Sequence, residues 1–142
     1  MDTRIFGTTA EEIEKAADVI RNGGLVAFPT ETVYGLGANA LDPDAVGKVY
    51  SAKGRPSDNP MIVHISSKDD ALKLTDRITG DMKKLMDAFW PGPLTMVVSA
   101  KTVIPKVTTG GLETVGIRMP SNPVAAELIS RSGVPIAAPS AN

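Results

Sequence analysis

Polar side chains able to hold an anion gather at the ends of the strands and helices that the sequence predicts. They are Thr30, Thr32, Lys53, Arg55, Asn59, His64, Arg118, Ser140 and Asn142. Guanidinium forks and ammonium groups offset phosphate charge, while hydroxyl and amide groups fix the position of a ligand through hydrogen bonds. This combination predicts a site for an anionic ligand such as a nucleotide phosphate.

The sequence lacks the usual phosphate-binding motifs. No stretch has the spacing Gly-x-x-x-x-Gly-Lys-Ser/Thr, and Gly35-Leu36-Gly37 continues without the third glycine of a dinucleotide fingerprint. Cysteine is absent and His64 is the sole histidine, which excludes a disulfide framework and a thiolate zinc site. The residues alone therefore predict an anion or nucleotide site and do not specify its ligand.

The first predicted strand, at 25–28, is the element that positions the earliest of these side chains. It is an apolar run closed by Pro29 and followed by the polar turn at 30–32, after which a second extended segment is expected at 33–38. Ligands in open α/β sheets usually lie at the carboxyl ends of strands. A similar order of glycine, apolar strand, proline and hydroxyl recurs at 133–140. Two strands are thus expected to present hydroxyl groups at one sheet edge.

Capping signals and apolar periodicity predict the helices. Thr9 and Glu12 form a capping box before an apolar stripe, and Asp42 with Pro43 opens a second helix that ends near Lys53. A third stripe at helical spacing predicts a helix whose core-facing side is Met82, Leu85, Met86 and Phe89. Two more helices are predicted, a short one at 67–74 and the last one at 122–133. Further strands are predicted at 61–65, 94–100, 115–119 and 135–138, and a loop at 54–60.

Strands alternate with helices along the chain. This order predicts an α/β (mixed α+β) domain with a layered, mixed sheet, because the two segments around Thr32 require antiparallel pairing. The 142 residues are 42% hydrophobic and 22% charged, as expected for one globular domain at 1–142. The chain stops at Asn142 directly after a strand, so we expect this domain to be incomplete at its C-terminus.

Charge and hydropathy narrow the function classes. The chain has 15 basic and 16 acidic residues, a net charge of −1, and 4% aromatic residues. This balance disfavours a protein that binds nucleic acid chiefly through phosphates or base stacking. No apolar run approaches the roughly 18 residues of a membrane span, and the N-terminus does not resemble a signal peptide. We expect a cytoplasmic protein without membrane association.

Four segments carry a specific combination of motifs. They read Phe-Pro-Thr-Glu-Thr-Val-Tyr-Gly-Leu-Gly at 28–37, Lys-Gly-Arg-Pro at 53–56 with Asn-Pro at 59–60, Trp-Pro-Gly-Pro-Leu-Thr at 90–95, and Ala-Pro-Ser-Ala-Asn at 138–142. In this order they closely resemble the YrdC-like family of threonylcarbamoyl-AMP synthases (the YrdC/Sua/TsaC type). The resemblance implies a three-layer fold in which helices flank a twisted, mixed sheet, with a concave and positively charged cavity.

The resemblance also implies an activity. Such an enzyme, a nucleotidyltransferase, condenses ATP, L-threonine and bicarbonate into L-threonylcarbamoyladenylate and diphosphate, the first step of forming N6-threonylcarbamoyladenosine at position 37 of tRNA. Mg²⁺ accompanies the ATP, and no metal-ligating side chain is implied. Downstream tRNA threonylcarbamoyl-transfer proteins receive the product, and RNA binding is kept open.

Site residues follow from matching this sequence to the family motifs. Lys53 and Arg55 match a Lys-x-Arg signature and are the implied catalytic residues, with Lys53 near the phosphates. Ser140 and Asn142 match a Ser-x-Asn signature. The implied ATP-binding residues are Arg55, Asn59, Thr114, Ser140 and Asn142. The implied threonine-binding residues are Thr32, His64 and Arg118, with Arg118 on the substrate carboxylate and His64 near its hydroxyl.

A structural explanation competes at several of these positions. Lys53 and Arg55 are typical of solvated loop charges when the motif is ignored. His64 lies in an apolar strand, where a structural histidine is at least as common as a ligand contact. Thr30 and Thr32 can close a turn that Glu31 caps or orients. Arg118 lies mid-strand, and a buried charge there requires a ligand or a carboxylate partner.

Other functions are weighed against the synthase. A double-stranded RNA-binding module would bind RNA with a strongly salt-dependent affinity that needs neither ATP nor threonine. A nucleotide-binding module without catalysis is disfavoured, because the family signatures at Lys53, Arg55, Ser140 and Asn142 are intact. A carbamoyl-transfer module, as in hydrogenase maturation proteins, would normally occupy a much longer chain with further domains. The residues expected after Asn142 complete the sheet and the cavity in this family, so the isolated 142-residue chain is expected to be poorly active or inactive.

Overall fold

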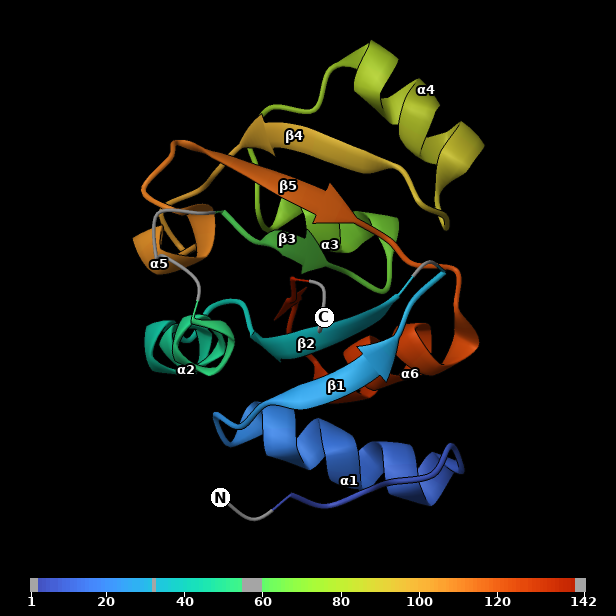
Figure 1. The fold of residues 1–142 in the computed structure, drawn as a ribbon. Coiled ribbons are helices and arrows are strands. Elements are labelled where there is room, and N and C mark those ends of the chain that lie inside the picture. Colours follow the sequence, from blue (N-terminus) through green and yellow to red (C-terminus); the bar gives the residue numbers. More distant parts are fainter. Residues whose placement is uncertain (1–2, 32, 55–59, 140–142) are drawn as a thin grey trace.

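A six-stranded sheet runs through the computed structural model, which describes residues 3–31, 33–54 and 60–139 (Figure 1). Its strands are β1 (Val26–Pro29), β2 (Tyr34–Asn39), β3 (Ile62–His64), β4 (Thr95–Ser99), β5 (Thr114–Arg118) and β6 (Ile136–Ala137). They lie in the order β1-β2-β6-β3-β5-β4. β3 and β5 are parallel, while the other neighbours are antiparallel. The predicted mixed sheet is confirmed.

Six helices precede or connect these strands along the chain in the described residues. They are α1 (Ala10–Arg21), α2 (Pro43–Lys53), α3 (Lys68–Leu72), α4 (Gly80–Phe89), α5 (Lys106–Thr109) and α6 (Pro123–Ser132). The short α5 lies between the strands predicted at 94–100 and 115–119, where the sequence predicts no helix. Within the described residues, no helix is both long and apolar enough to span a membrane.

The predicted caps hold the ends of the principal helices. Asp42 accepts from the backbone N–H groups of Asp44 and Ala45 at 3.0 and 3.2 Å, and the left-handed Gly54 ends α2. Thr9 accepts from the N–H of Glu12, as predicted. The capping box is only half formed, however, because the Glu12 carboxylate bonds the Thr9 hydroxyl and the N–H of Gly7.

One face of the sheet is apolar across almost its whole width. Neighbouring strands place five buried residues opposite one another in one row, and α2 and α3 pack over this face. The row is Ala38, Ala137, Val63, Ile117 and Met96. Such continuous burial explains why the central strands are uninterrupted apolar runs.

The opposite face is covered over half of the sheet. There α1 and α6 pack on each other and on the β1-β2-β6 half, burying Phe28, Ile136 and Ala138 (Figure 1). Over the β3-β5-β4 half the same face is open: Val97 is 63% exposed and Ile62 is 38% exposed. We refer to the residues of β3, β4 and β5 on this side as the open face.

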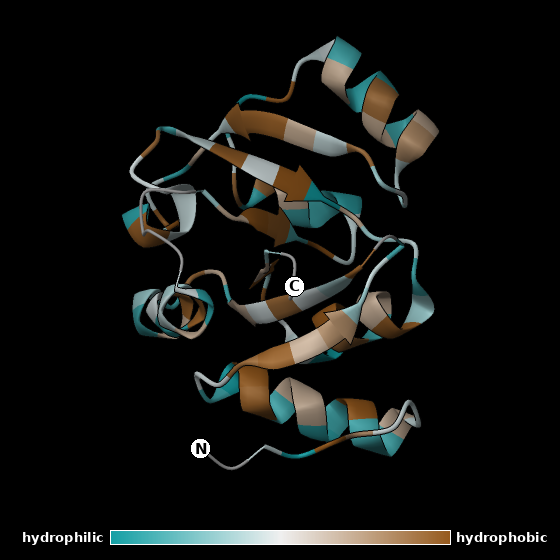
Figure 2. Ribbon diagram, in the orientation of Figure 1, coloured by the Kyte–Doolittle hydropathy of each residue, from teal (hydrophilic) through white to brown (hydrophobic). Residues whose placement is uncertain are grey.

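The predicted core side of α4 is wrong in part. Met86 is buried and Met82 packs partly against the core, but Leu85 and Phe89 are 43% and 55% exposed. α4 lies beyond the edge strand β4, so only one side of the helix meets the sheet, and hydrophobic residues remain at the rim of the fold (Figures 1 and 2). Periodicity identifies an apolar stripe but not how much of that stripe another element covers.

Candidate functional site

His64 and Arg118 lie side by side at the edge where α6 begins. They are the last residues of the parallel strands β3 and β5 and are paired in register. Both side chains therefore project from the same face of the sheet. His64 is 3% exposed and Arg118 is 8% exposed. The structure thus brings together two of the predicted site residues, 54 positions apart in the chain, where a ligand site of an α/β sheet is expected.

Arg118 is held by two partners from other parts of the chain. Its Nε donates to the carbonyl oxygen of Gly92 at 3.1 Å, and its Nη2 donates to the Glu31 carboxylate. The carboxylate partner that a buried arginine requires is therefore Glu31. Among the described residues, Nη1 of Arg118 has no hydrogen-bond partner. Its two N–H groups, together with the second N–H of Nη2, are the donors left for a ligand.

Glu31 contacts more than Arg118. Its second oxygen accepts from the backbone N–H groups of Ser121 and Asn122 at 3.2 and 3.1 Å, and Asn122 is the N-cap of α6. Burial alone would raise the pKa of Glu31, but the Asn122 N–H and the Arg118 guanidinium outweigh it and hold the pKa below its usual range. Glu31 is therefore ionised near neutral pH and joins the β1–β2 turn to β5 and α6.

The turn that carries Glu31 is closed by Thr30. The Thr30 hydroxyl donates to the carbonyl of Val33 and accepts from the Val33 N–H, while the two backbones bond at 3.0 Å. Thr30 thus has the turn-closing role that the sequence kept open. Thr32, which the sequence ranked above Thr30 as a ligand residue, lies outside the described residues.

His64 is buried in its neutral form. Burial lowers the pKa of His64 to about 4, and although the Ile136 carbonyl opposes this shift, the nearby Arg118 charge adds to it. Nδ1 lies 3.2 Å from the Ile136 carbonyl oxygen. A carbonyl oxygen can only accept, so Nδ1 carries the proton and Nε2 is left as an acceptor. The ring also meets Phe28 edge to face, with 5.9 Å between centroids.

Gly37 leaves room for the Phe28 ring and the Ile136 side chain to pack directly on β2. A Cβ at Gly37 would lie 2.6 Å from both the Phe28 ring and the Ile136 side chain. No side chain fits there without displacing its neighbours. The Gly-Leu-Gly segment that failed the dinucleotide fingerprint therefore serves close packing next to His64.

The other predicted site residues divide into two groups. Thr114 is exposed at the start of β5, four residues before Arg118 and on the same face of the strand. Lys53 is the half-buried last residue of α2, followed by the left-handed Gly54. The predictions that fall outside the described residues are Arg55, Asn59, Ser140 and Asn142.

Sequence reasoning missed the two groups that hold Arg118. It gave Glu31 only a local role in its turn, although a mid-strand arginine signalled that a carboxylate must lie nearby. It also placed no residue of the Trp-Pro-Gly-Pro segment at 90–93 in the site. Trp90 is a packing residue, which is buried and donates from its ring to the Leu94 carbonyl. The Gly92 carbonyl, however, also orients Arg118, and no side-chain pattern reveals such a backbone contact.

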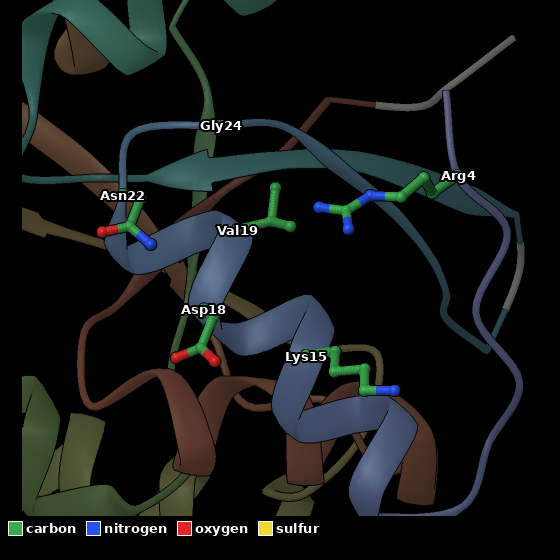
Figure 3. Close-up of a pocket in the computed structure, with 6 residues that line it drawn as sticks. All are labelled: Arg4, Lys15, Asp18, Val19, Asn22 and Gly24. Carbon is green, nitrogen blue, oxygen red and sulfur yellow. The ribbon is translucent and has the colours of Figure 1, made fainter. Parts of the chain in front are cut away.

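A surface pocket in the described part of the chain lies apart from the candidate site. Residues 3–31, 33–54 and 60–139 contain no group of three or more His, Asp or Glu side chains placed to hold a metal ion. A shallow pocket lies on the far side of α1 and is lined by Arg4, Lys15, Asp18, Val19, Asn22 and Gly24 (Figure 3). Its Asp18 already pairs with Arg21, and it contains none of the predicted site residues.

Known proteins share this sequence and fold. The Sua5_yciO_yrdC family model, described as "Telomere recombination", matches residues 18–142. A Bacillus subtilis protein named threonylcarbamoyl-AMP synthase is 56% identical over 139 residues, which are 96% of this chain and 40% of the relative. A Pyrococcus abyssi protein of the same name is 56% identical over 131 residues, covering 92% of this chain and 38% of the relative. The chain thus spans about 40% of the length of these two relatives.

A solved structure gives the same result in three dimensions. The crystal structure of P. abyssi Sua5 complexed with L-threonine superposes with a TM-score of 0.93 at 54% sequence identity. The superposition covers 99% of this chain and 40% of that one. These values extend the match from the sequence motifs to the arrangement of the whole described fold.

Proposed function

This chain belongs to the Sua5/YciO/YrdC family, and we propose that it carries the substrate site of a threonylcarbamoyl-AMP synthase. One observation carries the proposal: the chain matches the threonine-bound P. abyssi Sua5 over 99% of its length at a TM-score of 0.93. The pairing of His64 with Arg118 beside an open sheet face supports it. A nucleic-acid or nucleotide-binding module without catalysis has no comparable support.

The proposed reaction joins L-threonine, bicarbonate and ATP. The threonine amine attacks carbon dioxide and loses a proton, or attacks bicarbonate with loss of water, to give a carbamate in either case. A carbamate oxygen then attacks the α-phosphorus of ATP, and diphosphate leaves. Neither step needs a nucleophile from the protein, because positioning and charge neutralisation can carry phosphoryl-group chemistry.

The threonine end of the site is proposed at His64 and Arg118. Nη1 of Arg118 is available to donate to the substrate carboxylate, a contact that suits a guanidinium. Nε2 of the neutral His64 can accept a hydrogen bond from the threonine hydroxyl. A site built around that bond rejects an isosteric amino acid without the hydroxyl, because Nε2 would lose its partner. Thr32 is proposed as the third threonine contact on the basis of the family motif.

The ATP end is proposed further along the open face. Thr114 lies four residues before Arg118 on β5, which corresponds to about 13 Å along an extended strand. A ligand that reaches both Thr114 and Arg118 would therefore lie along β5. Lys53 and Arg55 are proposed to neutralise phosphate charge, and Asn59, Ser140 and Asn142 to bind the nucleotide. These roles rest on the family motifs.

Mg²⁺ is proposed to enter the site with ATP. This ion keeps several waters and is usually bound by one or two carboxylates together with substrate phosphates. The described residues offer no three-ligand cluster, so a phosphate-borne ion fits this chain better than a protein cage. When bound, Mg²⁺ would offset charge on the phosphates.

The cellular role follows from the product. We propose that the adenylate passes to cytoplasmic proteins that transfer the threonylcarbamoyl group to tRNA, at the N6 atom of adenosine 37. Direct RNA binding stays a prediction. The net charge of −1 gives no general attraction to RNA.

Labelled bicarbonate tests the proposal directly. The 142-residue chain and a chimera that continues after Asn142 with the Bacillus subtilis sequence are incubated with ATP, Mg²⁺, L-threonine and ¹⁴C-bicarbonate. We expect labelled threonylcarbamoyl-AMP and diphosphate from the chimera, and little or none from the isolated chain. Replacing L-threonine by L-valine should reduce product at least about 100-fold. A folded chimera that forms neither product, while the intact B. subtilis relative does, would contradict the proposal.

A further inference from the structure

One carboxylate, that of Glu31, connects three separate elements at the candidate site. One oxygen accepts from Arg118 at the end of β5, and the other accepts from two backbone N–H groups at the start of α6. Glu31 itself belongs to the β1–β2 turn, where Thr32 follows it directly. Its side chain is only 20% exposed. These contacts cross 87 to 91 positions in the sequence.

The contacts of Arg118 fix the plane of its guanidinium. Gly92 accepts from Nε and Glu31 accepts from Nη2, so two of the three nitrogens are held by partners on different segments. A planar guanidinium held at two nitrogens cannot rotate to re-aim the third. Nη1 is that third nitrogen. Within the described part of the chain, removing Glu31 would leave Arg118 attached only through the Gly92 carbonyl.

Glu31 also sets the charge of the site. It offsets the Arg118 cation where the two side chains are only 10% and 20% exposed, and it lies at the positive end of α6. Among the described residues, Glu31 is the carboxylate paired with Arg118, so its loss leaves the buried guanidinium there without a counter-charge, which is costly and favours a different side-chain position. The pair thereby keeps an arginine in place that would otherwise turn toward solvent.

We propose that Glu31 is a positioning residue of the amino-acid site. It aims Arg118 at the carboxylate of the substrate by tying that side chain to the start of α6. This inference rests on the proposed function, because it assigns Glu31 to the threonine end of the site and not to the ATP end. It goes beyond the assignment of the ligand residues themselves.

The geometry explains why other side chains would not replace Glu31. Glutamine has the same length but only one acceptor oxygen, so its amide NH₂ would face either the guanidinium or the two backbone donors. Aspartate keeps both acceptors but is shorter by one methylene and cannot span both partners. We therefore expect Glu31→Gln to impair the site in spite of its similar shape, and Glu31→Asp to restore it only in part.

Nuclear magnetic resonance and calorimetry on the 142-residue chain test the inference. The side-chain N–H signals of Arg118 report whether the guanidinium is held, and titration with L-threonine and separately with ATP reports each end of the site. In Glu31→Gln, the Arg118 Nη–H signals should exchange faster with water. The dissociation constant for L-threonine should rise by at least about tenfold, with less than about twofold change for ATP.

A matched control separates positioning from the general loss of an ion pair. Glu127 pairs with Nε of Arg131 on the surface of α6 at 2.7 Å, so Glu127→Gln removes the same kind of contact away from the site. It should leave both dissociation constants unchanged. In an Arg118→Gln background, Glu31→Gln should weaken threonine binding by less than about threefold further, because Glu31 acts through Arg118.

Two outcomes overturn different claims. Arg118 signals and threonine binding that stay as in the wild type in a folded Glu31→Gln variant would overturn the positioning role. Equal weakening of threonine and ATP binding would also overturn it and would indicate a purely structural tie. A wild-type chain and chimera that both fail to bind L-threonine would instead overturn the proposed function and, with it, the substrate assigned to Glu31.

Discussion

One row of residues crosses both halves of the sheet, and its surroundings differ between them. The covered half is β1-β2-β6, and the open half is β3-β5-β4. Asn39 and Ile136 lie on β2 and β6, where α1 and α6 cover the sheet, and Ile136 belongs to the apolar cluster beneath these helices. The row continues across β3 and β5 as His64 and Arg118, where no described helix covers this face as α1 and α6 cover β1, β2 and β6. Both polar side chains are buried. Their polar atoms bond to the Ile136 carbonyl, the Gly92 carbonyl and the Glu31 carboxylate.

This contrast separates two sources of order. The covered half is stabilised by apolar area that leaves water, which is non-directional and tolerates sequence variation. On the open face, His64 and Arg118 are ordered by a few directional polar contacts, each of which must be made by a particular atom. A ligand can use the second kind of surface, because Nη1 of Arg118 has no partner among the described residues.

The largest expected difference between the halves is in stability. Leu128 on α6 is 2% exposed, whereas Val97 on the open face is 63% exposed. Leu128→Ala should lower the free energy of unfolding by about 2–5 kcal/mol, and Val97→Ala by less than about 0.5 kcal/mol. Urea unfolding of both variants measures this. Similar losses would show that the open face is covered in solution.

The border between the halves gives the next effect. Gly37→Ala would place a Cβ 2.6 Å from Phe28 and Ile136, so overpacking should cost about 1–3 kcal/mol. Gly47 lies inside α2 with nothing within 4 Å of an added Cβ. Gly47→Ala should therefore stabilise the protein by about 0.5–1 kcal/mol. Thermal unfolding compares them, and a stabilising Gly37→Ala would refute the close packing next to His64.

The open half should also make stability depend on pH. The pKa of His64 is about 4 when folded and about 6.5 when unfolded, so the unfolded chain binds the proton more readily. Stability is complete above pH 6.5 and falls as the pH drops toward 4, by about 2 kcal/mol between pH 7 and 5. Denaturant unfolding of the wild type should show this loss, and His64→Gln should remove most of it. An equal loss in both proteins would contradict the neutral, buried histidine.

Helix caps give the smallest effect. Thr9 of the covering helix α1 accepts from the Glu12 N–H at 3.2 Å, whereas Ser67 before α3 makes no capping bond through its side chain. Thr9→Ala should cost about 1 kcal/mol, and Ser67→Ala less than about 0.5 kcal/mol. Equal costs in chemical unfolding would mean that Ser67 caps α3 in solution.

Local sequence signals located the strands and the longer helices, but they did not identify the contacts that hold the site together. Asp42, Pro43 and Gly54 fix α2 through contacts within a few residues, and such contacts can be predicted from sequence. The pairing of Glu31 with Arg118 spans 87 positions, and it exists only because β5 and the β1–β2 turn meet in the fold. The sequence could require a partner for Arg118 but could not name it. The exposure of Leu85 and Phe89 likewise depends on where α4 meets the sheet edge.

The sole histidine offers the most direct test of the central claim, that the open half holds an amino-acid substrate by its hydroxyl and carboxylate. The ¹⁵N signals of the His64 ring are measured in the 142-residue chain during titration with L-threonine and, separately, L-valine. The account predicts a neutral ring with the proton on Nδ1, and an Nε2 signal that shifts with L-threonine and not with L-valine. An Nε2 signal that ignores L-threonine, or responds equally to both amino acids, would contradict it.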